Sequence, residues 1–207
     1  MKSGESGELF KWLIASFLFG ARISERIAAS TYKQLERDGL VEPRRIISAG
    51  WSRLVESLDK GGYVRYDFST ADRLLLLSSE LLRSYEGDLN RLHKIAKDPD
   101  DLQRKLKEFK GIGDVTANIF LRELRGVWSK ANPPVQPPVV EAARNLGLVR
   151  SRSGRKVLEE LQKFWRTKRV PGKSFVNLET ALFRLGKRYC LKLRCGICPL
   201  RAKCKHF

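Results

Sequence analysis

Four cysteines near the C-terminus constrain this 207-residue chain more than any other feature. They are the chain's full set of cysteines, spaced as Cys190-x4-Cys195-x2-Cys198-x5-Cys204. Thiols at this density cannot be spread through a core as small apolar residues, but they can close around one metal centre. Thiolate ligands of this kind suit an iron–sulfur cluster or zinc. The sequence therefore predicts a metal-binding loop over residues 190–204.

The charge of the chain indicates its class of partner. It carries 41 Lys and Arg residues against 23 acidic residues, a net charge of +18. Such an excess is typical of proteins that bind a polyanion, most often nucleic acid. A ribosomal or membrane-surface protein would also be basic, so charge alone names no activity. The composition, 42% hydrophobic and 31% charged, is that of a globular chain rather than a disordered one.

The N-terminal region contains no export or membrane signal. Its longest apolar stretch, residues 10–21, is interrupted by Lys11 and Ser16 and is too short to cross a bilayer. Glu5 and Glu8 stand where a signal peptide has basic residues. We therefore expect a cytoplasmic, nucleoid-associated protein without a membrane partner. Clustered cysteines bind metal in such a reducing compartment rather than forming disulfides.

The hydrophobic pattern predicts an all-α protein. Helices are expected at about residues 9–17, 22–35, 43–49, 51–59, 69–85, 100–109, 115–124, 139–146, 154–168 and 174–190. Ser69 or Thr70 is expected to cap the helix that begins there. Four prolines within residues 132–138 exclude regular hydrogen bonding and predict an extended crossing segment.

Residues 106–118 predict two helices joined by the turn Gly111-Ile112-Gly113. Two glycines let the backbone approach a ligand closely, and the turn leads into a helix N-terminus that attracts phosphate. Such a hairpin grips a nucleic-acid backbone without reading its sequence. A plain corner between helices is the competing interpretation, and the basic charge favours binding. We expect Asp114 to cap the second helix.

The hairpin, the segment Val135-Gln136-Pro137-Pro138-Val139 and the cysteine loop follow one another in a known order. In that order they resemble the helix-hairpin-helix DNA glycosylase superfamily, specifically its endonuclease III-like branch, over nearly the full chain. The cysteine loop departs from the branch by having four rather than six residues between its first two cysteines. The resemblance implies a monomer that binds double-stranded DNA carrying a damaged or abasic site.

The resemblance also implies two helical lobes with a DNA-binding cleft between them. Residues 23–131 form one lobe and contain the hairpin at about 102–124. Residues 1–22 and 132–207 form the other, which contains the cysteine loop.

By the same resemblance, Cys190, Cys195, Cys198 and Cys204 hold a 4Fe–4S cluster. Zinc stays open as an alternative, although structural zinc usually joins two separated cysteine pairs. The implied DNA-binding residues belong to the hairpin, two earlier loops and the cysteine loop: Lys110, Gly111, Ile112, Gly113, Val115, Thr116, Arg22, Tyr63, Arg65, Lys192 and Arg194. Core packing of Tyr63 and a merely solvated basic tail are the competing interpretations.

The catalytic positions depart from the family. Val115 stands where bifunctional members carry a lysine that forms a Schiff base, so we expect no lyase activity. Gln136 stands where the family has an aspartate, and an amide can neither offset a sugar cation nor act as a base. Asp114 and Glu141 are candidate substitutes, although Glu141 could instead pair with Arg144 on its own helix.

Three functions follow from these residues. The first is a DNA-repair enzyme that carries out monofunctional base excision with a non-standard catalytic residue. The second is a catalytically inactive protein that recognises damaged or distorted DNA. A more distant alternative is an RNA-binding protein, because the hairpin can grip the phosphates of either polymer. No motif identifies the lesion.

Overall fold

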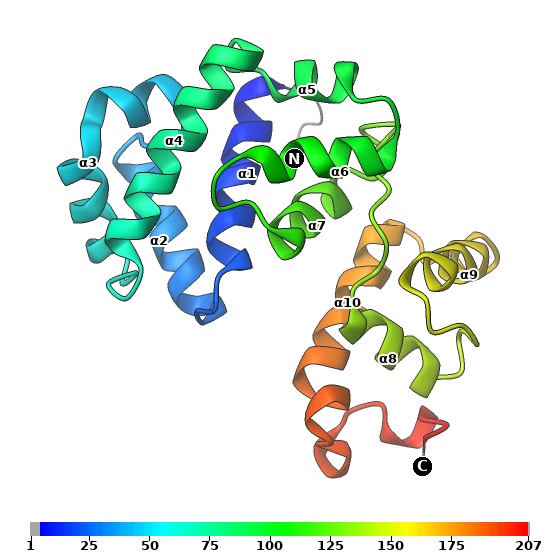
Figure 1. Cartoon of the computed structure of the whole chain (residues 1–207). Coiled ribbons are helices and arrows are strands. Elements are labelled where there is room, and N and C mark those ends of the chain that lie inside the picture. Colours follow the sequence, from blue (N-terminus) through cyan, green and yellow to red (C-terminus); the bar gives the residue numbers. More distant parts are fainter. Residues whose placement is uncertain (1–4, 207) are drawn as a thin grey trace. The chain divides into compact units, whose positions relative to one another are not determined.

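A computed structural model describes residues 5–206 and confirms the all-α fold (Figure 1). Within these residues the chain forms ten α-helices, three short 3-10 helices and no β-strand. The α-helices are α1 (Ser6–Gly20), α2 (Glu25–Arg37), α3 (Pro43–Lys60), α4 (Asp67–Tyr85), α5 (Leu89–Ile95), α6 (Pro99–Glu108), α7 (Asp114–Glu123), α8 (Pro137–Asn145), α9 (Gly154–Thr167) and α10 (Phe175–Arg188). No helix in the described part of the chain is long and apolar enough to cross a membrane.

The chain divides into two compact units, Met1–Asn132 and Pro133–Phe207. The division falls at the proline run, where residues 131–136 have no regular structure and Pro137 and Pro138 open α8. Each unit has its own hydrophobic core. The cleft expected between two lobes stays a prediction.

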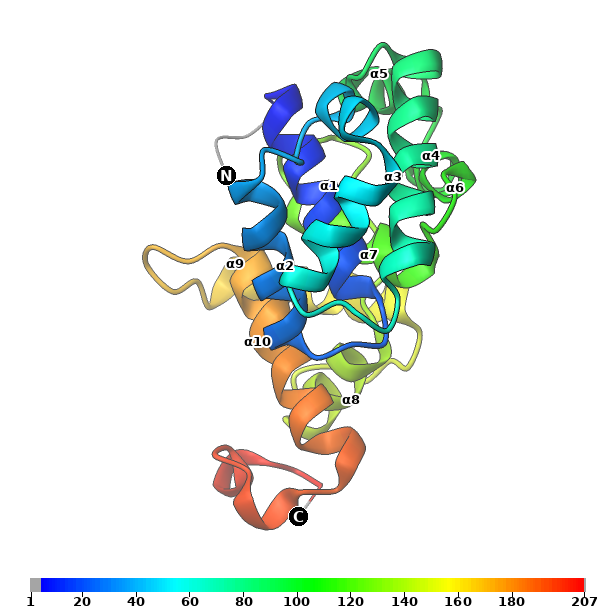
Figure 2. The same cartoon turned by 90° about the vertical axis from the view of Figure 1, so that its left-hand side faces the viewer.

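Helix α1 belongs to the first unit, whereas the sequence had placed residues 1–22 with the second. Eight of its 15 residues are buried, on several sides of the helix. A helix that is apolar nearly all round needs cover on all sides. Contacts with α2, α5 and α7 provide it, and α1 runs through the middle of this unit (Figures 1 and 2). The Trp12 indole N–H donates to the Phe120 carbonyl, 3.1 Å away.

Local backbone signals explain where several helices begin and break. Gly50 has φ 73° inside α3 and kinks it, which agrees with the two short helices expected there. Helix α4 begins at Asp67 rather than near Ser69, and the expected cap residue Thr70 is buried in its first turn. The sequence analysis missed α5, whose signal was the N-cap Asp88, which accepts from the Asn90 amide at 2.9 Å.

The second unit depends on close contact between α8 and α10. At Gly186 on α10, a Cβ atom would overlap the backbone carbonyl of Pro138 at the start of α8. Glycine therefore allows the two backbones to meet. The cysteine loop begins directly after α10, with the 3-10 turn Cys190–Lys192 packed on α8.

This contact predicts that Gly186→Ala lowers the free energy of unfolding by about 1–3 kcal/mol, as overpacking of a core does. The overlapping atom is backbone, which cannot move aside as a flexible side chain would. Chemical denaturation followed by circular dichroism measures the loss, and amide hydrogen exchange locates it in the second unit. Gly7→Ala is the control, because Gly7 is exposed in α1 with no heavy atom within 4 Å of the added Cβ. Because Gly7 is an exposed residue in the first turn of α1, this change should alter stability by less than about 0.5 kcal/mol. An unchanged stability in Gly186→Ala would show that the helices can separate without cost.

Candidate nucleic-acid interface and candidate metal centre

Three segments expected to contact DNA converge on one cavity of the first unit. The cavity measures about 510 Å³. Its walls come from the hairpin, from the end of α1 with the turn after it, and from the loop between α3 and α4 with the start of α4: Phe17, Gly20, Ala21, Arg22, Tyr63, Tyr66, Thr70, Arg73, Gly111, Gly113, Asp114, Val115 and Thr116. We call it the hairpin cavity.

The hairpin turn is held by its two central residues. Gly111 has φ +89°, a left-handed conformation that favours glycine. A Cβ there would stand 2.7 Å from the Phe17 ring and 2.8 Å from the Arg73 Cδ atom. Ile112 is buried, and its N–H donates to the Phe109 carbonyl at 3.0 Å. The turn is therefore a rigid element anchored on α1, and the Ile112 side chain is not available to a ligand.

Helix α7 starts without a side-chain cap. Gly113 is its N-cap, with extended backbone and open space around the position of a Cβ. Asp114, expected as the cap, is instead the first helical residue, and its carboxylate pairs with Lys107 of α6 at 2.7 Å. The pair bridges the two hairpin helices. Because no side chain caps this helix start, the first-turn N–H groups and the helix dipole of α7 can attract an anion.

Contact with α1 buries Thr116, also in the first turn of α7. A Cβ on Gly20 would overlap the Thr116 hydroxyl, so the two helices touch at this glycine. Thr116 can offer a ligand its backbone N–H more readily than its side chain. Val115 beside it is about half exposed, at 52%, and carries no nucleophile.

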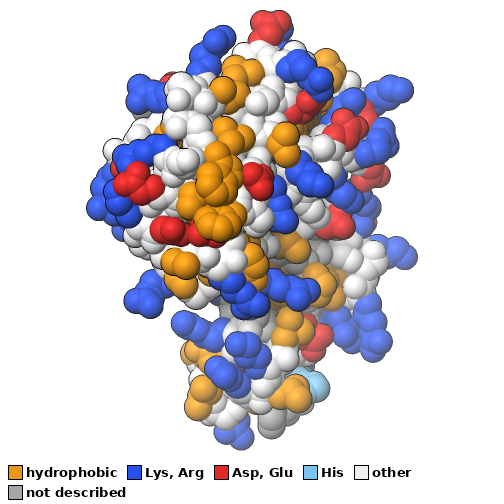
Figure 3. Space-filling view, turned by 60° about the vertical axis from the view of Figure 1, so that its left-hand side comes forward, with side chains coloured by type: hydrophobic (Ala, Val, Ile, Leu, Met, Phe, Trp, Pro, Cys, Tyr) orange, Lys and Arg blue, Asp and Glu red, His pale blue; other side chains and the backbone are white. Residues whose placement is uncertain are grey.

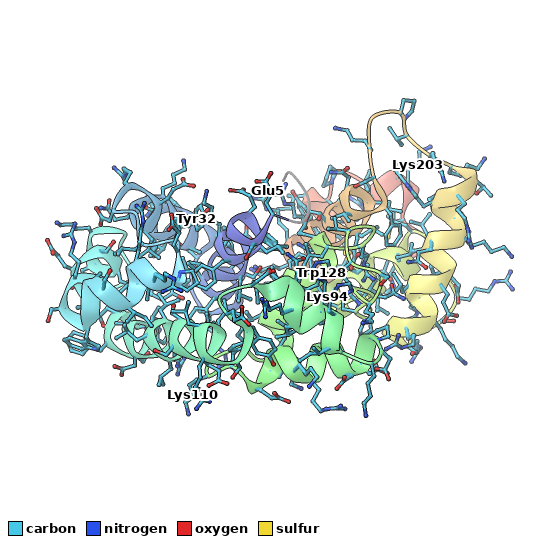
Figure 4. All side chains as sticks on the ribbon, turned by 90° about the horizontal axis from the view of Figure 1, so that it is seen from above. Glu5, Tyr32, Lys94, Lys110, Trp128 and Lys203 are labelled. Carbon is cyan, nitrogen blue, oxygen red and sulfur yellow. The ribbon has the colours of Figure 1, made fainter. Side chains whose placement is uncertain are left out.

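Cations surround the hairpin cavity. Arg22 and Arg73 line it and are exposed, and Lys110 extends outward at the edge of the first unit (Figure 4). Arg65 lies outside the wall, with its guanidinium 5.4 Å from the centre of the Tyr66 ring. Sequence analysis missed Arg73, although its spacing of three from Thr70 places both on one face of α4.

Tyr63 is a core residue rather than a base-stacking one. Its side chain has no exposed surface, and its hydroxyl donates to the Leu18 carbonyl at 3.4 Å. Burial raises the pKa of Tyr63 to about 12. Tyr66, half-buried with its ring 6.2 Å from that of Tyr63, is the tyrosine with surface to offer in the cavity.

In the second unit, Gln136 is held by its backbone. It is the N-cap of α8, and its carbonyl accepts from the N–H groups of Val139 at 2.9 Å and Val140 at 3.2 Å. Its side chain makes no cap hydrogen bond and is half-buried. The amide side chain brings hydrogen-bonding groups to this position but no charge.

Glu141 lies beside the cysteines. Its Oε1 atom accepts from the Asn145 amide at 3.2 Å, whereas the sequence had offered Arg144 as an alternative partner. Glu141 and Asn145 both line a pocket of about 100 Å³ together with all four cysteines. We call it the cysteine pocket. This position gives Glu141 a structural partner and weakens its case as a substitute catalyst.

Asn145 links α8 to the cysteine loop. Its side chain hydrogen-bonds to Cys190, its backbone carbonyl accepts from the Lys205 N–H at 2.6 Å, and the Lys205 side chain covers Gly147. Burial raises the pKa of the Cys190 thiol, against the opposing effect of the hydrogen bond from Asn145.

The four thiols suit a metal centre in their chemistry, and all four line one pocket. Cys190 and Cys195 each begin a 3-10 turn, whereas Cys198 and Cys204 each end one, so tight turns direct the four into the cysteine pocket. All four are half-buried and free of disulfides. Within residues 5–206, no three His, Cys, Asp or Glu side chains converge closely enough to hold a single metal ion. Lys192 and Arg194 are exposed on the same loop.

The fold resembles that of endonuclease III. The chain superposes with a TM-score of 0.59 on a solved structure of a trapped endonuclease III–DNA covalent intermediate, an estranged-adenine complex. The two are 22% identical, and the match covers 95% of this chain and 83% of the other. No protein-family model and no curated protein matches the sequence. At this identity the likeness establishes the fold, and the function has to be argued from the site.

The position of Asn145 predicts that Asn145→Ala loosens the metal centre. Without the amide, Cys190 loses a hydrogen-bond donor and Glu141 loses its partner. Removing a residue that hydrogen-bonds to a metal ligand typically lowers metal affinity about 10–100-fold. The rate at which a chelator removes bound iron or zinc measures the effect. Gln162→Ala, which removes a half-buried amide from α9, should leave that rate unchanged. Equal rates in both variants would contradict the assignment.

Proposed function

We propose that this protein binds damaged or abasic double-stranded DNA through its helix-hairpin-helix. One observation carries the proposal: the uncapped start of α7 at Gly113 lines the same cavity as Arg22 and Arg73. The free N–H groups and helix dipole attract a phosphate, and arginine binds phosphate through two parallel hydrogen bonds. The endonuclease III fold supports the same assignment.

The hairpin cavity is suited to an extruded nucleotide. Its volume of about 510 Å³ falls in the roughly 300–1,000 Å³ range of small-molecule pockets. Tyr66 offers an aromatic face, and enzymes that act on bases read a flipped base by stacking and by hydrogen bonds to its edge. Recognition of a damaged or missing base in this cavity is therefore part of the proposal.

We infer that the cysteine pocket holds a 4Fe–4S cluster. The four cysteines form one compact run over residues 190–204, whereas structural zinc usually joins two separated cysteine pairs. When bound, the cluster supplies a cross-link that holds the loop on α8 and α10. Lys192 and Arg194 then face phosphates from a fixed loop. Equal amounts of iron and acid-labile sulfide, with no zinc, are the expected analysis.

Recognition without base excision is the version that the site supports best. Gln136 brings no carboxylate, Val115 brings no amine, and Glu141 is engaged beside the cysteines. Base excision remains a second candidate because of one residue. Asp114 lines the hairpin cavity, and its side chain is 74% exposed beside Lys107, so a carboxylate stands where a nucleotide would enter.

Gly113→Asp tests the phosphate grip without disturbing the fold. Aspartate is a favoured N-cap and the position has room, so the free energy of unfolding should change by less than about 1 kcal/mol. The new carboxylate occupies the first-turn N–H groups and repels phosphate. Affinity for a duplex with an abasic-site analogue should fall about tenfold or more, the effect of losing one charge-assisted hydrogen bond.

Fluorescence anisotropy at fixed salt measures this change. Gly7→Asp adds the same charge at an exposed position of the same unit and is the control. Equal affinities in both variants would contradict the hairpin grip, and tighter binding to duplex RNA would favour the RNA-binding alternative.

A panel of lesion-bearing duplexes separates recognition from catalysis. The wild-type protein and Asp114→Asn should release no base, and Gln136→Asp is the variant expected to gain activity, because it restores the carboxylate of the endonuclease III-like family. Borohydride trapping should give no covalent adduct, because Val115 has no amine. Base release by the wild-type protein that disappears in Asp114→Asn would establish the second candidate, an excision enzyme.

A further inference from the structure

The positive charge of the chain is concentrated in its second unit. Residues 133–207 hold 18 of the 41 Lys and Arg residues and four acidic residues, which gives them +14 of the net +18. Three of those acids are engaged locally. Glu179 is buried, Glu160 accepts from the Arg150 N–H at 2.7 Å, and Glu141 lines the cysteine pocket. On the visible face of this unit, blue side chains are common and red ones are scarce (Figure 3).

Helix α9 carries part of this charge on one face. Its apolar residues Val157, Leu158 and Leu161 are buried in the core of the unit. At 100° per residue, the opposite face brings four cations together. They are Arg155, Lys156, Lys163 and Arg166, all exposed, with Glu159 among them. Figure 4 shows long side chains projecting from this helix away from its own unit.

The loop after α9 continues the basic surface. Lys168, Arg169 and Lys173 are exposed in it. Its tip is a defined turn, in which Pro171 precedes Gly172 at φ +69° and the Lys173 N–H donates to the Val170 carbonyl at 3.1 Å. The loop projects from the second unit in two views (Figures 2 and 4). We call the face of α9 and this loop together the α9 ridge.

We propose that the α9 ridge binds the phosphate backbone of duplex DNA, as a contact surface additional to the hairpin and the cysteine loop. The inference rests on the proposed function and deepens it. A helix of 14 residues is about 21 Å long at 1.5 Å per residue, and that length spans roughly six base pairs at 3.4 Å each. Because phosphates carry no sequence information, the ridge would add affinity for any duplex without adding preference for a lesion.

The composition of the ridge favours nucleic acid over a membrane surface. Helices that lie on a bilayer insert a bulky apolar face, but the apolar face of α9 is buried in its own core. Val170 is the large hydrophobic residue exposed in the loop, at 51%. Three arginines, Arg155, Arg166 and Arg169, supply the planar fork that matches phosphate. The ridge therefore offers charge and hydrogen bonds without an apolar anchor.

Removing four ridge cations tests the proposal in the full-length protein. The ridge variant is Lys163→Gln, Arg166→Gln, Lys168→Gln and Arg169→Gln. The control variant changes Lys11, Arg53, Lys60 and Arg83 to Gln, which lowers the net charge equally in the first unit. Binding of undamaged and abasic-analogue duplexes is measured over a range of salt concentrations.

For the ridge variant, the slope of log K against log salt should become shallower by about three to four, since each phosphate contact contributes about 0.9. Its affinity at low salt should fall more than tenfold, with the ratio between abasic and undamaged duplexes unchanged. The control variant should keep a slope close to that of the wild-type protein.

The outcomes separate this inference from the proposed function. If the wild-type protein prefers abasic DNA and the ridge variant keeps its slope, the ridge inference fails alone. If the wild-type protein binds no DNA at low salt, both fail. Sedimentation with phosphatidylserine vesicles completes the test. If the ridge variant loses binding to vesicles but keeps its binding to DNA, the ridge is a membrane surface and the inference is overturned. Should the ridge variant unfold, the exposed loop pair Arg169→Gln and Lys173→Gln gives the same readout with a change in slope of about two.

Discussion

The close contact between the end of α1 and the hairpin is the constraint on which the candidate interface depends. The Phe17 ring lies directly beneath Gly111, and Gly20 meets Thr116 without a side chain between them. The first contact holds the turn in its left-handed conformation, and the second sets the start of α7 against α1. Because α1 is buried on several sides, it cannot shift without opening the core of the first unit. The uncapped helix start therefore sits on a rigid support, which is what a phosphate-binding backbone needs.

In the second unit, the structure assigns structural contacts to residues that the sequence had offered as catalytic candidates. Asn145 connects α8 to the cysteine loop through its backbone carbonyl and its side chain, and Glu141 belongs to the same set of contacts. Glu141, a candidate substitute catalyst from the sequence, is thereby a neighbour of the four cysteines. Gln136 is held at the start of α8 with an uncharged side chain. The unit thus combines a strongly positive surface with a shortage of acidic groups for catalysis.

Much of the fold followed from the sequence because the signals are local. Gly50 kinks its helix through its own backbone conformation, which does not depend on distant contacts. The proline run lies at the boundary between the two compact units. The hairpin was also predictable, because Gly111 takes the left-handed conformation that its tight turn requires and Gly113 directly precedes the start of a helix. The helix at α5 was missed because a seven-residue helix with one capping residue gives a weak pattern.

The composition and order of the residues are enough to predict an all-α, strongly basic chain with a hairpin, a cysteine loop, a valine at position 115 and a glutamine at position 136. They could not establish that Tyr63 is buried or that Glu141 lies by the cysteines. Nor could they place Arg73 in the wall of the hairpin cavity or α1 in the core of the first unit. These features depend on contacts between residues far apart in the chain. A side chain's own chemistry is the same in a core, a cavity wall or a solvated surface, so only packing assigns it to one of them.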